Sequence, residues 1–176
     1  MFIEKGNIRI RNAAAEDAII LAAWWNDGAV MAHAGFPNGT GQTAEEIAKS
    51  LGTDTDETHR RMIIEIDGTP VGETNYRNLG NSTAELGIKI CDASKQEKGY
   101  GRKILSMLIA SLFERFGYKK IVLDTNFNNT RAQHVYEMLG FRKLCVHVDS
   151  WKNQLGELRS QVCYEMTQED FINYAE

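Results

Sequence analysis

The sequence predicts a mixed α/β fold: a mostly antiparallel, twisted sheet of about seven strands with helices on both faces. Runs of adjacent strand patterns imply antiparallel pairing, because short turns join antiparallel neighbours. A strand–helix–strand unit across residues 84–123 implies one parallel pair, since a parallel connection needs a crossover. The 176 residues are 43% apolar and 25% charged, ordinary values for a globular protein, and we expect one domain over residues 1–176.

The first quarter of the chain predicts one strand and two helices. Residues 8–11 (Ile-Arg-Ile-Arg) alternate apolar and polar side chains, as in a half-buried strand. Asn12 is expected to cap a helix that continues to about Trp25. The capping-box pattern at residues 43–46 predicts a second, short helix, and the glycine-rich stretch 34–41 between the two helices is expected to be a loop.

The middle of the chain predicts a hairpin, a strand and a long helix. Residues 61–66 and 70–77 flank Asp67-Gly68, a pair that suits a turn with positive φ. Residues 84–90 alternate again and predict the next strand. The helix that follows has one apolar face, made of Ile104, Leu105, Leu108, Ile109, Leu112, Phe113 and Phe116.

The last third predicts three more strands and one helix. Residues 121–123 are expected to form a short buried strand, and Asn128 or Asn129 to cap a helix that Gly140 ends. Two final strands, joined by a polar insert, are expected at residues 144–148 and 161–166, with the insert at residues 149–160.

Charge and hydropathy exclude several classes of partner. The net charge of −4 argues against general nucleic-acid binding and mildly favours a cationic or neutral partner. The sequence has no apolar run of about 18 residues, so we expect no membrane span. Residues 1–6 do not resemble a signal peptide, and we expect a cytoplasmic protein.

Cysteine and histidine spacing does not predict a metal site. The cysteines, Cys91, Cys145 and Cys163, are odd in number and are not paired at zinc-binding distances along the chain. The histidines, at positions 33, 59, 134 and 147, form no zinc pattern either. We therefore interpret the cysteines as reduced, mostly buried thiols and expect no catalytic metal.

The segment from Gln96 to Lys103 carries the clearest chemical signal. Gly99 and Gly101 let the backbone approach a ligand closely, and the helix that follows directs unpaired N–H groups to the same place. This arrangement is typical of a site for a phosphate-bearing ligand. A dinucleotide fingerprint would need glycine at Ile104, and a Walker loop would need Gly-Lys-Ser/Thr, so both are excluded.

Two motifs carry a resemblance to a known family. Residues 96–101 (Gln-Glu-Lys-Gly-Tyr-Gly) fit one, and residues 129–132 (Asn-Thr-Arg-Ala) with 136–141 (Tyr-Glu-Met-Leu-Gly-Phe) fit the other, about 30 residues later. Together they resemble the GNAT superfamily of acetyl-CoA-dependent N-acetyltransferases, over residues 8–166.

Two further segments are similar to one subgroup of that superfamily. These are residues 24–27 (Trp-Trp-Asn-Asp) and the loop around residues 35–37 (Gly-Phe-Pro). The subgroup contains the ribosomal-protein N-terminal acetyltransferases, together with relatives that act on polyamines, amino acids and aminoglycosides.

The resemblance implies how acetyl-CoA is held. The strand before the glycine segment is expected to splay from its parallel neighbour and to pair its backbone with the pantetheine arm, while backbone N–H groups of residues 98–103 hold the pyrophosphate. Asn129 matches the asparagine that contacts the cofactor arm, although a helix cap explains it equally well. The expected cofactor contacts are Ile88, Lys89, Ile90, Gln96, Glu97, Lys98, Gly99, Tyr100, Gly101, Arg102, Lys103 and Asn129.

The resemblance also implies a proton donor and leaves the base open. Tyr136 matches the tyrosine that protonates the departing thiolate. Its reference pKa of roughly 10 exceeds the roughly 8.5 of a thiol, so the site must lower the tyrosine pKa or pass the proton on. Glu85 is the expected base for the acceptor amine, directly or through water, and Glu73 is the alternative; either could instead be a solvated strand residue.

These features predict an N-acetyltransferase in which a primary amine attacks acetyl-CoA directly within a ternary complex, with Cys91 structural. The alternative is a non-catalytic CoA-binding or regulatory module of the same fold. The acceptor is expected to be a protein N-terminus or a small amine, gripped by the first two helices, the loop 33–42 and the insert 149–160. A homodimer is compatible with the sequence, but no residue requires it.

Overall fold

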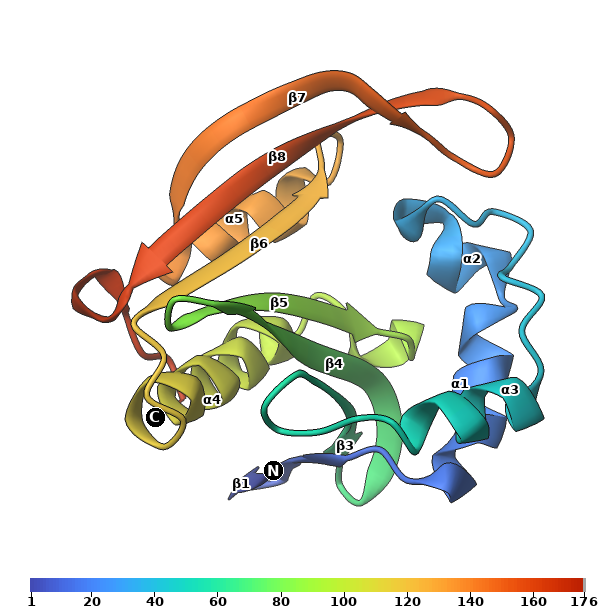
Figure 1. The fold of residues 1–176 in the computed structure, drawn as a ribbon, viewed down its shortest axis with the longest axis horizontal. Coiled ribbons are helices and arrows are strands. Elements are labelled where there is room, and N and C mark those ends of the chain that lie inside the picture. Colours follow the sequence, from blue (N-terminus) through green and yellow to red (C-terminus); the bar gives the residue numbers. More distant parts are fainter. Residues whose placement is uncertain (176) are drawn as a thin grey trace.

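The computed structural model describes residues 1–175 and has one open sheet of eight strands in the order β1-β2-β3-β4-β5-β6-β8-β7 (Figure 1). Every neighbouring pair is antiparallel except β5–β6, which confirms the predicted mixed, mostly antiparallel sheet. The strands are β1 Phe2–Lys5, β2 Ile8–Asn12, β3 His59–Ile66, β4 Thr69–Gly80, β5 Thr83–Ile90, β6 Lys120–Asn126, β7 Arg142–Lys152 and β8 Leu158–Thr167.

The eighth strand is β1, which the sequence analysis did not predict. It pairs with β2 through a turn at Gly6 and Asn7, where Gly6 has a φ of 59°. Three of its four residues are exposed, so the strand shows little alternation between an apolar and a polar face. Without that alternation, a four-residue edge strand gives almost no periodic signal.

Helices cover both faces of the sheet, as predicted (Figure 1). The long helix α4 packs its apolar face against one side, and α1 and α3 pack against the other. Strand β3 is buried on both sides, because Ile64 belongs to the core under α4 and Ile63 to the core under α1 and α3. The helices are α1 Ala18–Trp25, α2 Gly28–Met31, α3 Ala44–Leu51, α4 Tyr100–Glu114 and α5 Thr130–Met138.

Helix α1 starts later than predicted, and Asn12 is not its cap. Asn12 is the last residue of β2, paired with Met62, and its side-chain oxygen accepts a hydrogen bond from the N-terminal amine at 2.6 Å. A 3₁₀ turn at residues 15–17 precedes α1. Asp17 organises this turn, since its carboxylate accepts bonds from the Ala14 N–H at 2.8 Å and from Arg11 at 2.7 Å.

The centre of the sheet is split, and the C-terminal hairpin is longer than predicted. In β5 and β6, residues Thr83–Glu85 pair with Lys120–Val122, and beyond these residues the two strands diverge, which confirms the expected splay.

The insert 149–160 is not a loop for most of its length, because β7 continues to Lys152 and β8 begins at Leu158. Within residues 1–175, every helix is too short or too polar to cross a membrane.

Candidate active site

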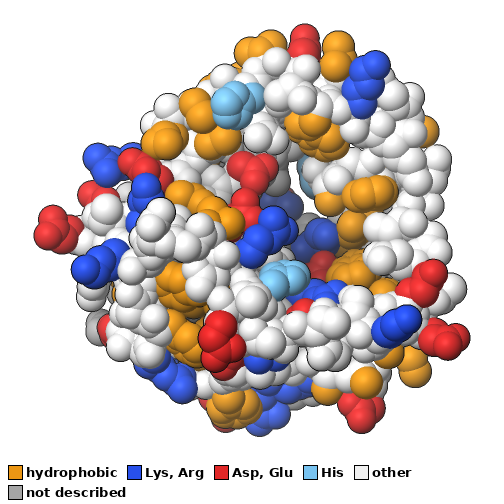
Figure 2. Space-filling view, in the orientation of Figure 1, with side chains coloured by type: hydrophobic (Ala, Val, Ile, Leu, Met, Phe, Trp, Pro, Cys, Tyr) orange, Lys and Arg blue, Asp and Glu red, His pale blue; other side chains and the backbone are white. Residues whose placement is uncertain are grey.

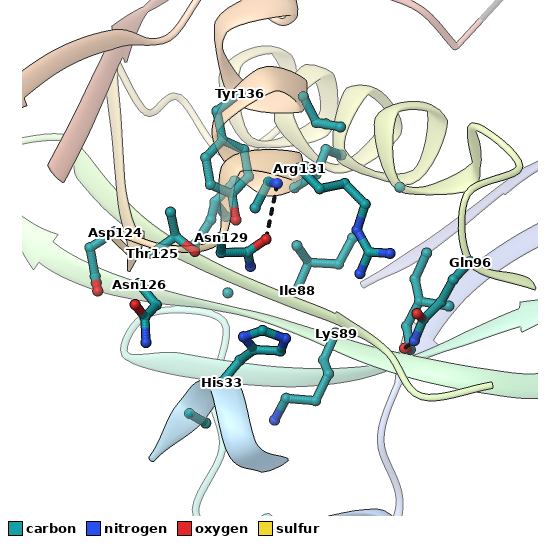
Figure 3. Close-up of a pocket in the computed structure, with 18 of the residues that line it drawn as sticks. His33, Ile88, Lys89, Gln96, Asp124, Thr125, Asn126, Asn129, Arg131 and Tyr136 are labelled. Atoms are coloured by element: carbon teal, nitrogen blue, oxygen red, sulfur yellow. Dashed lines mark hydrogen bonds between the residues drawn. The ribbon is translucent and has the colours of Figure 1, made fainter. Parts of the chain in front are cut away.

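A cavity of about 760 Å³ opens where β5 and β6 diverge. Its walls come from β5, the segment before α4, the end of β6 and the first turns of α5. The segment 29–34, with α2, and Trp151 of β7 close its other end. Figure 2 shows the molecular surface hollowed at this place, and Figure 3 shows the side chains that face the hollow.

One end of the cavity is built from backbone at the start of α4. Gly99 has a φ of +80°, which favours glycine, and a Cβ added there would meet open space. The first-turn N–H groups of α4 have no carbonyl partner within the helix, as at any helix N-terminus. The Gln96 side chain lines the cavity and donates to the Ile90 carbonyl at 2.8 Å, which ties the segment to the end of β5.

Two arginines add positive charge to this end. Arg102 lines the cavity, its guanidinium lies 4.4 Å from the Tyr174 ring centroid, and its buried Nε lacks a hydrogen-bond partner among the described residues. Arg131 lines the cavity beside Glu97, with which it pairs at 3.1 Å. An anion at the α4 N-terminus would accept hydrogen bonds from the free amides and would be attracted by the charge of Arg102.

The structure divides the expected cofactor contacts into two groups. Those that line the cavity are Ile88, Lys89, Ile90, Gln96, Glu97, Gly99, Gly101, Arg102 and Asn129. Lys98 and Lys103 have exposed side chains outside the cavity lining, and Tyr100 also lies outside it. These three can contribute only through their backbone.

Asn129 has the cap role that the sequence suggested, and it also lines the cavity. Its side-chain oxygen accepts a hydrogen bond from the Ala132 N–H at 3.2 Å (Figure 3). The cap uses only the oxygen of the amide. The two interpretations of Asn129, helix cap and ligand contact, are therefore compatible.

Tyr136, on α5, lines the cavity. Its ring is 7% exposed and packs against the rings of Phe141 and Tyr164, with centroid distances of 5.9 and 5.7 Å. Its hydroxyl points into the cavity (Figure 3). Burial, and secondarily the charge of Asp124, raise the pKa of Tyr136 to about 12, so its hydroxyl stays protonated near neutral pH.

Asp124 is an acidic residue of the cavity that the sequence analysis missed. It lies on β6, two residues beyond the last pairing with β5, and it lines the cavity near Tyr136 (Figure 3). Asp124 is open to solvent in the cavity, but partial desolvation by the surrounding protein, and secondarily the charge of Glu85, raise its pKa above the ordinary value. The available signal was its position directly after the buried strand residues 121–123, where the splay exposes the next side chain.

Neither glutamate expected as the base lines the cavity. Glu85 pairs with Arg77 at 3.5 Å, on the part of β5 that is still paired with β6. Glu73 accepts a hydrogen bond from the Trp25 indole at 2.8 Å and pairs with Lys89 at 3.4 Å, so it holds α1 and β5 together.

Cys91 is also outside the cavity lining. Burial, and secondarily the charge of Glu73, raise the pKa of its thiol to about 12.

The other end of the cavity is closed by a contact between distant segments. The Gln154 N–H donates to the Gly35 carbonyl at 2.8 Å, and the Gln154 amide donates to the Gly39 carbonyl at 3.0 Å. The Trp151 ring lies against Gly35 so closely that a Cβ there would be 2.6 Å from it. The loop after α2 and the tip of the β7–β8 hairpin thus form one wall; that this wall grips the acceptor stays a prediction.

A family model for the GNAT acetyltransferase domain matches residues 7–142, well over half of the chain. The chain belongs to the GNAT acetyltransferase family. This membership confirms the resemblance inferred from the two motifs and identifies an N-acetyltransferase.

Solved structures share the fold over nearly the whole chain. Spermidine N-acetyltransferase from Vibrio cholerae, in complex with CoA and spermine, has a TM-score of 0.84 at 19% identity, covering 96% of this chain and 100% of that one. A probable acetyltransferase has a TM-score of 0.83 at 20% identity, with 97% and 99% covered. Ribosomal-protein-S5-alanine acetyltransferase from Vibrio fischeri has a TM-score of 0.80 at 16% identity, with 98% and 99% covered.

Proposed function

We propose that this protein transfers the acetyl group of acetyl-CoA to a primary amine by direct attack within a ternary complex. One observation carries the proposal. A single cavity connects the free amides at the start of α4 with Asp124 and Tyr136, through the gap between β5 and β6. A phosphate-bearing thioester and an amine can therefore enter from opposite ends and meet in the middle.

Acetyl-CoA fits the first half of this cavity. Its pyrophosphate would accept hydrogen bonds from the first-turn amides of α4 and from Arg102. Its amide-containing arm would lie along residues 88–90, whose backbone edge faces the gap left by β6. The structurally similar spermidine N-acetyltransferase was solved with CoA, which supports a CoA thioester as the donor here.

Asp124 is our candidate for the group that activates the amine. An alkylammonium has a pKa of roughly 10.4, so it must lose a proton before its nitrogen can attack the thioester carbonyl. The raised pKa of Asp124 makes it a stronger base than a solvated aspartate, and its negative charge attracts the ammonium form. Glu85, outside the cavity, contributes by raising the pKa of Asp124; its role as a base acting through water stays a prediction.

Tyr136 is our candidate for the group that receives the departing thiolate. With a pKa of about 12, against roughly 8.5 for a thiol, complete proton transfer to sulfur would be uphill by about 5 kcal/mol. The tyrosine therefore keeps its proton and stabilises the thiolate by donating a hydrogen bond. The proton that ends on sulfur comes from solvent, which balances the proton that the amine releases.

We call the end of the cavity that contains Asp124 and Trp151 the acceptor end, and the end at the start of α4 the cofactor end. The charges at the acceptor end favour an amine with one positive charge. Among the described residues that line the cavity, the acids are Asp124 and Glu97, and Glu97 is paired with Arg131 at the cofactor end. Two neutral residues that line the cavity, Asn126 and Gln161, lie one side-chain repeat along the strands from Asp124. The second carboxylate that acts on Asp124 is Glu85, which lies outside the lining and is paired with Arg77. A peptide N-terminus needs one carboxylate, whereas a polyamine needs several, so we propose the former as the acceptor class.

Thiol release in the presence of an amine panel tests the function. The protein is incubated with acetyl-CoA and a thiol-reactive dye, with a free Ala-peptide, the same peptide blocked by N-acetylation, or spermidine. We expect thiol release only with free amines, fastest with the peptide, and mass spectrometry should show one added acetyl group. CoA binding without release for any amine would instead support the non-catalytic module.

A further inference from the structure

The β7–β8 hairpin brings Cys163 of β8 beside two metal-ligating side chains of β7. Cys145 and His147 are two residues apart on β7, so they share a face, and Cys163 lies opposite Cys145 on β8. The Cys145 sulfur is 3.3 Å from His147 Nε2, and the ligand atoms of all three residues lie within 4.8 Å of one another. Cys91, Cys145 and Cys163 are half-buried, not mostly buried as the sequence led us to expect. The spacing of Cys145, His147 and Cys163 along the chain gave no sign of this cluster.

These distances, up to 4.8 Å, are within about 1 Å of the edges of a tetrahedral zinc site. Zinc bonds of about 2.3 Å to sulfur and 2.0 Å to nitrogen place two tetrahedral ligands about 3.6 to 3.8 Å apart. Small side-chain rotations would therefore admit an ion. Two thiolates and one imidazole are soft ligands that prefer zinc to magnesium or calcium. Three protein ligands leave a fourth position open, as in exchangeable sites rather than closed structural ones.

The backbone holds the cluster in place. Residues 145–147 pair regularly with 161–163, between register shifts on either side. Val162, at the centre of this stretch, is fully buried on the opposite face of the sheet. Because Val162 anchors β8 to the core, its neighbour Cys163 must point away from the helices α4 and α5.

The cluster also adjoins the acceptor end of the cavity. Cys163 lies opposite Asp124 on β6, and Gln161 lies opposite both Asn126 and His147. Asp124, Asn126 and Gln161 all line the cavity. Neighbouring strands are about 4.8 Å apart, so an ion held by Cys163 would lie close to the carboxylate of Asp124.

We propose that Cys145, His147 and Cys163 form a site for a soft divalent cation, zinc in particular, and that the bound ion inhibits acetyl transfer. On binding, each thiol releases one proton to solvent and no group changes its oxidation state. The positive charge beside Asp124 would repel an ammonium acceptor from the cavity. The inhibitory role rests on the proposed function, whereas the binding site does not.

Cobalt titration of the reduced, metal-free protein tests the site without using activity. We expect one equivalent of Co²⁺ to produce a thiolate-to-metal charge-transfer band, which Zn²⁺ then displaces. The variants Cys145→Ser, Cys163→Ser and His147→Ala should each weaken affinity by about tenfold or more, whereas Cys91→Ser should bind like the wild type. His147 is exposed, so His147→Ala keeps the test valid if a cysteine variant folds poorly.

The absence of a charge-transfer band, or an equal loss of binding in Cys91→Ser, would overturn the site. Inhibition is tested separately, by measuring acetyl transfer with and without Zn²⁺. We expect Zn²⁺ to slow the wild type but not His147→Ala, and a chelator to restore the rate. Zinc binding without slowing would overturn the inhibitory role. If no amine is acetylated at all, the proposed function fails while the cobalt result stands.

Discussion

The two ends of the cavity are built in different ways. The cofactor end comes mainly from one stretch of chain, residues 88–102, and offers backbone groups, a positive-φ glycine and Arg102. The acceptor end gathers side chains from the 3₁₀ turn 32–34 after α2, from β6 and from β7, including His33, Asp124 and Trp151, which lie far apart in the sequence. A ligand shared by a whole family can be held by backbone, whereas a variable acceptor requires side chains from segments that can change independently.

The largest effect is expected at Tyr136, the candidate hydrogen-bond donor to the thiolate. Tyr136→Phe keeps the ring packing but removes the hydrogen-bond donor, so kcat should fall by a few hundredfold while CoA affinity changes little. Steady-state kinetics and calorimetry with CoA measure the two quantities. The matched control is Tyr164→Phe, whose hydroxyl bonds Glu137 outside the cavity. Equal losses of kcat and CoA affinity in Tyr136→Phe would indicate a packing role.

Asp124 should matter for the acceptor end alone. Asp124→Asn should lower kcat/KM for the amine by about a hundredfold without changing CoA affinity. Because partial desolvation raises the pKa of Asp124, the wild-type rate should increase with pH over a range above that of an ordinary aspartate, as the carboxyl loses its proton. The variant should lack this limb of the profile. Glu85→Gln is the control, and a larger loss there would return the base to Glu85.

At the cofactor end, Gly99→Val should weaken CoA binding by about tenfold, because a branched side chain is strained at a φ of +80° and fills the space beside the α4 amides. Gly117→Val is a matched control, since Gly117 has a φ of +71° and open space but lies outside the cavity lining. Both variants should lose stability in thermal unfolding, but only Gly99→Val should lose CoA affinity. Equal CoA affinities in calorimetry would remove Gly99 from the site.

The smallest effect is expected at the wall of the acceptor end. Trp151→Ala removes the ring that packs on Gly35, so the KM for the amine should rise by about threefold while CoA affinity stays unchanged. Leu155→Ala, at an exposed position on the same hairpin tip, is the control. If Trp151→Ala weakened CoA binding instead, the division of the cavity into two ends would be incorrect.

Much of the fold followed from local patterns. The capping box at Thr43 and Glu46 forms as predicted, with both reciprocal hydrogen bonds, and Asn129 caps α5. The errors occurred where a tertiary contact outweighed a local preference. Asn12 has the side chain of a cap, but pairing with Met62 extends β2 through it and the N-terminal amine takes its oxygen.

The sequence by itself determined the order of the elements after β1, the family and the geometry of the glycine segment before α4, because glycine conformation and helix amides are properties of neighbouring residues. Only the tertiary structure decided which of the two carboxylates faces the cavity. Glu85 lies within one predicted strand, and Asp124 directly follows another. Because β5 and β6 diverge after Glu85 and Val122, Glu85 stays in the paired part of the sheet and Asp124 faces the cavity. The Cys145–His147–Cys163 cluster likewise depends on strand register, which linear spacing does not encode.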